Sequence, residues 1–221
     1  MNANDAPAAL PEGRPLLRGF LHLGACLAAI AGIVVMLLLA HDARGYVGAS
    51  VFGASLIVVY GVSAAYHRFP SGTRMADIMR RLDHAMIFFL IAGTYTPFCL
   101  IALGNAWGIA LLSITATIAG IGALTRLAWL NSPRWLALSL YLATGWVALI
   151  AISQILQKLD VVPILLLFLG GIAYSVGGIA YAAKRPDPWP RVFGYHEVFH
   201  SFTIMGSASH FLAVAVFLLP G

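Results

Sequence analysis

Five polar side chains in this sequence have the types and the spacing of a metal site. His196 and His200 are four residues apart, so on a helix their imidazoles lie on one face, one turn from each other. Such a pair can chelate one divalent ion. Ser63 and His67 have the same spacing, and Asp83 is a carboxylate close to the start of a later apolar stretch.

Three histidines with no thiolate favour zinc, although iron, nickel and copper also accept imidazole. A set of three histidines leaves the fourth position of zinc open for water, which is the arrangement of catalytic zinc. Each signal alone also has an ordinary structural explanation. His67 can lie at a membrane interface, Ser63 can bond within its own helix, and Asp83 can pair with a nearby arginine. The elements that carry these residues decide whether they meet.

Those elements are helices that span a membrane. Of 221 residues, 61% are hydrophobic and 10% are charged, whereas soluble domains carry about 25% charged residues. The continuous apolar runs predict a bundle of seven transmembrane helices, all-α, in a single domain over residues 19–221 after a short polar cytoplasmic tail, residues 1–18. The predicted spans are 19–40, 46–66, 82–103, 107–127, 135–156, 161–183 and 198–219.

Lysine and arginine predict the orientation of the bundle. With the N-terminus inside and the C-terminus outside, the inner segments hold eleven of these residues and the outer loops hold only Arg44 and Lys158. In a bacterium this places the chain in the inner membrane. The net charge of +5 does not indicate nucleic-acid binding, because no soluble basic module is present and the charges lie in short loops.

This topology brings the polar residues to one depth, near the cytoplasmic face. The second span ends at His67, the third opens at Asp83, and the seventh opens at His196. Ionisable groups at membrane depth mark either internal pairing or function. His84 points about 100° away from Asp83, and His210 lies deeper, as a packing or hydrogen-bonded residue. His22 shares the level of the site, with no role assigned.

The arrangement resembles the hemolysin III family, which is related to the progestin and adipoQ receptors, including the adiponectin receptors. That family has Ser-x3-His at the end of the second span, Asp opening the third, and His-x3-His opening the seventh; here these are Ser63–His67, Asp83 and His196–His200. The resemblance covers nearly the whole chain. It implies that the three histidines bind zinc, that Asp83 holds water at the fourth position, and that Ser63 hydrogen-bonds nearby.

One motif departs from the family pattern. The family usually carries Glu-x2-Asn-x3-His at the first span, and this chain keeps His22 but has Pro15 and Arg18 at the Glu and Asn positions. The acidic residue is therefore missing or moved, for example to Glu12. This change concerns the substrate or partner at the inner face more than it concerns the zinc.

These observations predict a membrane-embedded zinc hydrolase. Three neutral imidazoles leave zinc its full charge, which lowers the pKa of bound water, and Asp83 and Ser63 are then the catalytic residues. A site at headgroup level suits a lipid amide or ester as substrate, and the resemblance implies a ceramidase-like activity. The alternative is a non-enzymatic receptor, or a hemolysin-like pore or transporter, stabilised by zinc. Membrane lipids are the expected partners, and the sequence leaves the oligomeric state open.

Overall fold

A computed structural model describes residues 15–68, 72–129 and 131–220. Within these ranges the chain is helical and forms no β-sheet, and seven helices are long and apolar enough to cross a membrane. Four spans are the helices α1 (Phe20–Leu39), α2 (Ala43–Arg68), α4 (Ala106–Ala128) and α7 (Val161–Ala183). The other three change their helical geometry along the way. They consist of α3 (Thr73–Pro97) with η1 (Phe98–Leu103), of α5 (Arg134–Gly145), η2 (Trp146–Ala151) and α6 (Ile152–Lys158), and of α8 (Tyr195–Leu212) with η3 (Ala213–Leu218).

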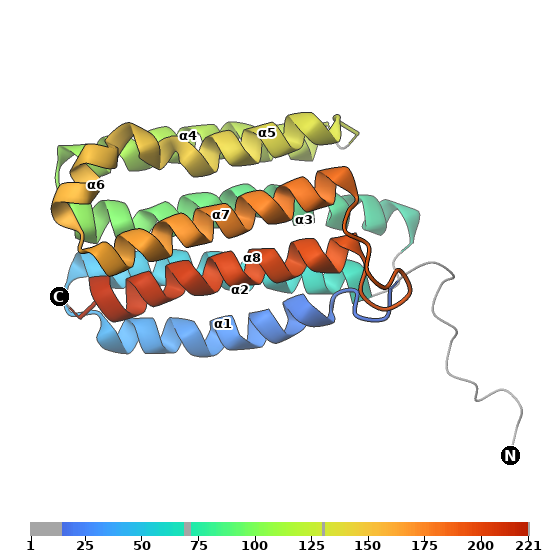
Figure 1. Cartoon of the computed structure of the whole chain (residues 1–221), viewed down its shortest axis with the longest axis horizontal. Coiled ribbons are helices and arrows are strands. Elements are labelled where there is room, and N and C mark those ends of the chain that lie inside the picture. Colours follow the sequence, from blue (N-terminus) through green and yellow to red (C-terminus); the bar gives the residue numbers. More distant parts are fainter. Residues whose placement is uncertain (1–14, 69–71, 130, 221) are drawn as a thin grey trace, which may run out of the picture.

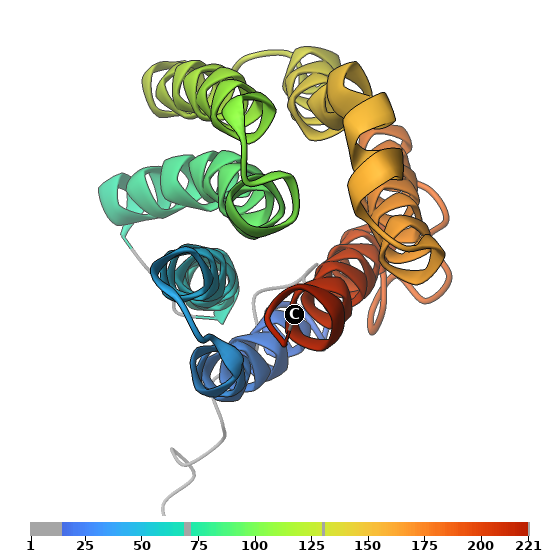
Figure 2. The same cartoon turned by 90° about the vertical axis from the view of Figure 1, so that its left-hand side faces the viewer.

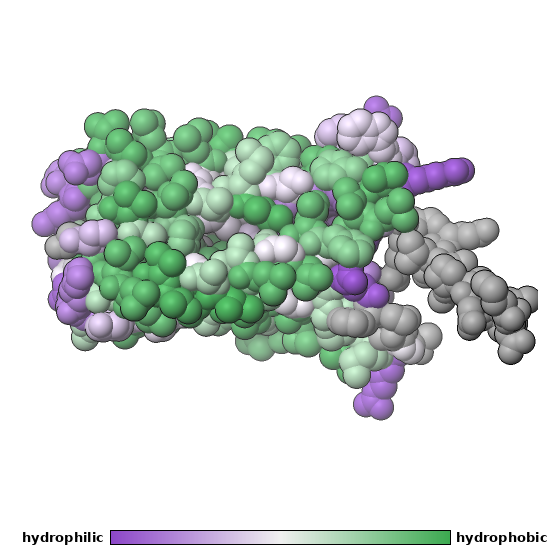
Figure 3. Space-filling model, turned by 90° about the horizontal axis from the view of Figure 1, so that it is seen from below, coloured by the Kyte–Doolittle hydropathy of each residue, from purple (hydrophilic) through white to green (hydrophobic). Residues whose placement is uncertain are grey.

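The spans form a ring. Spans that follow one another in sequence run antiparallel and side by side, and α8 returns to lie against α1 (Figures 1 and 2). The surface between the two polar ends is apolar (Figure 3), with large side chains such as Leu38 and Val161 about seven-tenths exposed or more. An apolar band of this kind must face lipid. The prediction of an all-α integral membrane protein of seven spans is therefore confirmed.

Two of the predicted spans begin too late in the sequence, at the end of the bundle that carries the polar residues. The third helix begins at Thr73 instead of residue 82, and the seventh begins at Tyr195 instead of residue 198. The extra turns of α3 carry charged residues such as Arg74 and Asp77, which lower the hydropathy without preventing a helix. Asp83 and His84 therefore lie inside α3, and His196 lies in the first turn of α8.

The change of geometry in the fifth span has a visible cause. The Tyr95 hydroxyl on α3 donates to the carbonyl of Gly145 over 2.7 Å and accepts from the backbone N–H of Ala148 over 2.8 Å. A side chain inserted into the hydrogen-bond ladder of a helix bends it. The α-helix accordingly ends at Gly145 and continues as the 3-10 segment η2.

The described part of the predicted polar tail is tied to the bundle. The backbone N–H groups of Leu16 and Leu17 donate to the carbonyls of Arg191 and Val192, in the connection between α7 and α8. Residues 1–14 of the predicted tail lie outside the described residues. Treatment of residues 1–18 as a separate segment therefore stays a prediction.

Candidate metal site

The start of α8 positions two of the candidate ligands. Asp187 accepts a hydrogen bond from the backbone N–H of Tyr195 over 2.9 Å, and Glu197 accepts one from the N–H of Gly194 over 2.9 Å. Both bonds satisfy N–H groups that have no acceptor within the helix. With the first turn fixed in this way, His196 and His200 lie on one face, and their ring centroids are 4.4 Å apart.

The third candidate ligand comes from the end of α2. His67 brings its Nε2 to 3.1 Å from Nε2 of His196, and its ring centroid lies 5.3 Å from that of His200. Each of the three histidines contributes one ring nitrogen to the cluster, and these three nitrogens all lie within 4.8 Å of one another. The structure therefore brings together the three histidines that the sequence singled out.

Asp83 and Ser63 border the same cluster. Oδ2 of Asp83 lies 3.9 Å from Nε2 of His67, and Ser63 lies beside the carboxylate. Ser63 is buried and lies one helical turn before His67. Both predicted catalytic residues are thus beside the histidines, while their roles stay predictions.

His22 joins the cluster from α1. Its ring lies parallel to that of His200, with centroids 3.6 Å apart and an interplanar angle of 13°. It is 3% exposed, and neither ring nitrogen has a hydrogen-bond partner among the described residues. The residue left without a role in the sequence therefore packs directly on a candidate ligand.

The two remaining span histidines lie outside the cluster, as their positions predicted. His84 places Nδ1 2.7 Å from a terminal nitrogen of Arg126. His210 uses Nε2 to bond the carbonyl of Leu167 over 3.1 Å. The expectation that His210 is a hydrogen-bonded residue is confirmed.

An ion pair beside the ligands was not anticipated. Arg18 pairs with Glu197, whose side chain is completely buried between the two ligand positions of α8. By sequence alone Asp83 can pair with a nearby arginine, but Arg18 pairs with Glu197. The signal was available, because a carboxylate inside His-x3-His at membrane depth requires a cation.

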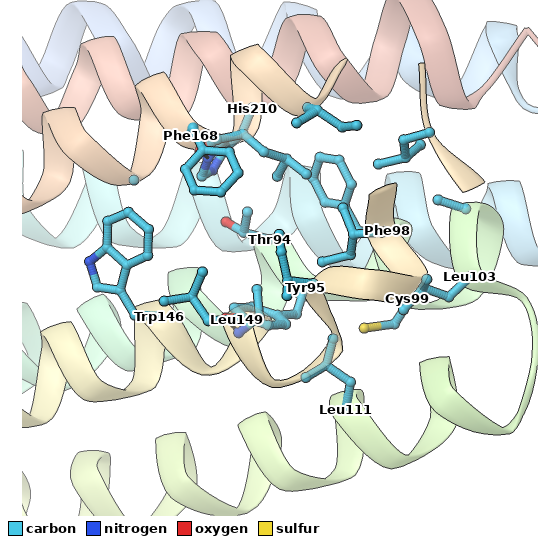
Figure 4. A pocket seen from close by; sticks show the side chains of 18 of the residues that line it. Thr94, Tyr95, Phe98, Cys99, Leu103, Leu111, Trp146, Leu149, Phe168 and His210 are labelled. Atoms are coloured by element: carbon cyan, nitrogen blue, oxygen red, sulfur yellow. Dashed lines mark hydrogen bonds between the residues drawn. The ribbon is translucent and has the colours of Figure 1, made fainter. Parts of the chain in front are cut away.

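The cluster lines a cavity of about 480 Å³ at one end of the bundle. Two apolar cavities follow it toward the other end, and neighbouring cavities share wall residues: Tyr141 and Thr203 belong to the first and second, and Thr94 and His210 to the second and third. Figure 4 shows the third cavity, where His210, Phe168 and Trp146 lie on one side of Thr94 and Tyr95 of α3. The interior is therefore polar at the histidine end and apolar beyond it.

The donor set fits zinc. Tetrahedral zinc binds imidazole nitrogens at about 2.0–2.1 Å, which places ligand atoms of one site a little over 3 Å apart. The His67–His196 nitrogen separation of 3.1 Å has this size, and the buried His200 has an Nδ1 with no partner among the described residues. His67, His196 and His200 are therefore the residues that would hold the ion.

A ring of seven membrane-spanning helices with a buried three-histidine cluster at one end defines a heptahelical membrane protein with a candidate metal centre. The family model described as "Haemolysin-III related" matches residues 12–211, and the chain belongs to this family. The chain is similar to "Hemolysin-3 homolog" of Bacillus subtilis (strain 168), with 34% identity over 85% of this chain and 86% of the relative.

Two further relatives widen the comparison. "Hemolysin-3" of Bacillus cereus is 31% identical over 90% of this chain and 88% of its own length. "Heptahelical transmembrane protein ADIPOR2" of Oryza sativa subsp. japonica is 26% identical over 76% of this chain and 80% of its own length. The resemblance stated from the motifs is therefore confirmed. With seven apolar helices and bacterial relatives, the chain is an integral protein of the bacterial plasma membrane.

Proposed function

We propose that the protein is a zinc-dependent hydrolase that acts on a lipid amide or ester from within the membrane. The observation that carries the proposal is the convergence of His67, His196 and His200 beside a carboxylate, Asp83, at the wall of a cavity. When bound, zinc supplies a Lewis acid that acidifies water and polarises a carbonyl.

The chain's own residues supply the remaining chemistry. Asp83 takes a proton from the attacking water and delivers it to the leaving group, the work of a general base and then of a general acid. Ser63 lies beside this carboxylate, where its hydroxyl would hold the carboxylate in orientation. The three ligand histidines bring no negative charge when neutral, so they would leave the charge of a bound zinc ion undiminished.

The interior of the bundle supports a lipid as the substrate. Its polar cavity holds the histidines, and the apolar cavities continue from it through shared wall residues. An amphiphile whose scissile bond lies at the histidines would therefore have apolar surroundings for its chains. The family resemblance favours a ceramidase-like amide, and the cavities are equally compatible with an ester.

Metal content tests the first half of the proposal. Purified protein should carry about one zinc per chain, because three imidazoles and water complete a tetrahedral site. We expect His196→Ala and His200→Ala to fall below a tenth of that content. His41→Ala, at an exposed loop histidine, should retain it. Equal metal in all four proteins would reject the site.

Turnover tests the second half. Zinc-loaded protein should hydrolyse a fluorescent ceramide or phospholipid, and chelation should abolish the reaction. Asp83→Asn should keep its zinc and lose about 10²- to 10⁴-fold in kcat, since removal of a general acid–base has that effect. If zinc-loaded wild-type protein turns over neither lipid, the hydrolase function is rejected.

The names of the bacterial relatives favour a second candidate, a hemolysin-like pore stabilised by zinc. Liposomes that contain the protein and a trapped dye separate the two functions. Zinc-dependent leakage without lipid turnover supports the pore, and turnover without leakage supports the hydrolase.

A further inference from the structure

The polar cavity is lined by more arginines than there are carboxylates to pair with them. Among the described residues that line it are four arginines and one carboxylate, Asp83. Arg18 is paired with Glu197, and Arg80 lies 3.7 Å from Asp77 at the exposed start of α3. Arg126 and Arg134 have no ion-pair partner in the described ranges.

Arg126 is the most informative of these residues. It lies near the end of α4, is 5% exposed, and is hydrogen-bonded to Nδ1 of His84 and to Ser132. A guanidinium only donates hydrogen bonds, so His84 accepts and brings no negative charge. The Nε of Arg126 has no partner among the described residues. The guanidinium is thus held in place by neutral groups, with its charge uncompensated.

A purely structural role does not account for that charge. Arg126 ties α3 and the α4–α5 connection to α4, but a neutral amide could make the same two bonds. A buried cation without a counter-ion is costly, because little water is available to solvate it. An anion in the adjoining cavity removes that cost, and an arginine fork matches the oxygens of phosphate.

The other two arginines approach the same point. Arg80, Arg126 and Arg134 all line the cavity, and the charges of all three act on His84. Arg134, at the start of α5, stands over the ring of Tyr181 at 5.8 Å. Donors therefore reach the cavity from α3, α4 and α5, whereas the histidine cluster is built by α1, α2 and α8.

We propose that Arg126, together with Arg80 and Arg134, forms a binding subsite for an oxyanion of the phosphate class, in the cavity that also holds the histidines. The ligand is a phosphate group, carried by a lipid headgroup or free in solution. If the protein is the proposed hydrolase, the subsite predicts a substrate with a phosphate headgroup. Only this prediction about the substrate rests on the proposed function. As a binding site it is independent of catalysis.

Binding of a non-hydrolysable lipid tests the subsite. The probes are an ether-linked phosphatidic acid with two octyl chains and the matched ether lipid that ends in a hydroxyl, titrated by calorimetry into purified protein in a neutral detergent. We expect the phosphate lipid to bind at least tenfold more tightly, which corresponds to about 1.4 kcal/mol. Arg126→Gln should remove that preference and leave binding of the hydroxyl lipid unchanged.

Matched variants control for charge and for folding. Arg81 lies at the same end of α3, donates to the carbonyl of Leu127, and does not line the cavity. The variant Arg81→Gln should therefore bind both probes as the wild type does. Arg134→Gln changes an exposed residue and should reduce the preference in part, which keeps the proposal testable if Arg126→Gln does not fold. Equal affinity for the two probes, or the same loss in Arg81→Gln, overturns the subsite.

Competition identifies the source of the anion. Displacement of the phosphate lipid by inorganic phosphate supports a site for the free ion, and failure to displace it supports a headgroup site. The binding assay involves no turnover. If the protein shows no preference for the phosphate probe, the subsite is rejected, but a hydrolase that acts on neutral lipids is not. Conversely, Arg126-dependent binding of the phosphate probe, together with no turnover of ceramide or phospholipid in the separate turnover assay, supports the subsite and excludes the hydrolase.

Discussion

The ion pair between Arg18 and Glu197 connects a departure from the family pattern to the candidate metal site. Arg18 stands where the family usually has Asn, and its guanidinium neutralises a carboxylate that is completely buried between His196 and His200. Glu197 also accepts from the N–H of Gly194 at the start of α8. The pair therefore fixes the first turn of α8, on which the ligand geometry depends.

The two members of this pair should not be equivalent. Arg18→Met leaves a buried carboxylate without its cation, which destabilises a protein by about 3–5 kcal/mol. Glu197→Gln keeps the cap and leaves an arginine whose side chain is 20% exposed and can reach water. We expect its cost to be the smaller one, about 1–2 kcal/mol. Thermal or denaturant unfolding in detergent measures both variants.

The double variant shows whether the two side chains act as a pair. Arg18→Met with Glu197→Gln should be less destabilised than the sum of the single variants, since each removes the same contact. Strict additivity would contradict the pair. Zinc content should fall in Arg18→Met if the pair also holds His196 and His200 in position.

Among the elements, α7 and α8 pack most closely where glycine leaves room. A methyl group at Gly177 would lie 2.7 Å from Cβ of Phe202, and one at Gly206 would lie 2.8–2.9 Å from the ring of Tyr174. These separations are too short for carbon atoms. The expectation from membrane proteins that small residues let helices approach therefore applies to this pair.

Alanine at these positions should weaken the bundle. Gly177→Ala forces the helices apart, and overpacking of this kind costs about 1–3 kcal/mol. Gly120 on α4 is the matched control, because its added methyl group would meet nothing within 4 Å. Gly120→Ala should be neutral or stabilise by up to about 1 kcal/mol, as alanine favours a helix over glycine. Similar unfolding temperatures for the two variants would argue against close α7–α8 packing.

Hydropathy and one-turn spacing are the two features of the sequence that predict the fold and the site best. Seven apolar runs predict seven spans, and a spacing of four predicts that His196 and His200 share a face. Hydropathy does not reveal the charged first turns of α3, nor the 3-10 segment that depends on Tyr95 of another helix. The stacking of His22 on His200 depends on a tertiary contact, which no local pattern contains. The position of Glu197 between two histidines indicates that a cation must pair with it, but only the tertiary structure identifies that cation as Arg18.

At the scale of the whole molecule, the positive charges gather at the end of the bundle that holds the histidines. The helix ends and connections there carry Arg68, Arg81, Lys184 and their neighbours, whereas Arg44 and Lys158 lie at the other end. Cytoplasmic segments are the ones enriched in lysine and arginine. The candidate site is therefore predicted to face the cytoplasm, with the C-terminus outside.

Single cysteines at opposite ends of the bundle test this orientation. In a background of Cys26→Ala and Cys99→Ala, which removes two free thiols, Asp160→Cys marks the start of α7 and Trp189→Cys the connection to α8. Both positions are exposed. A maleimide that cannot cross membranes should label Asp160→Cys in spheroplasts and Trp189→Cys only after permeabilisation. The opposite pattern would place the histidines at the outer face, where a substrate would have to come from the outer leaflet.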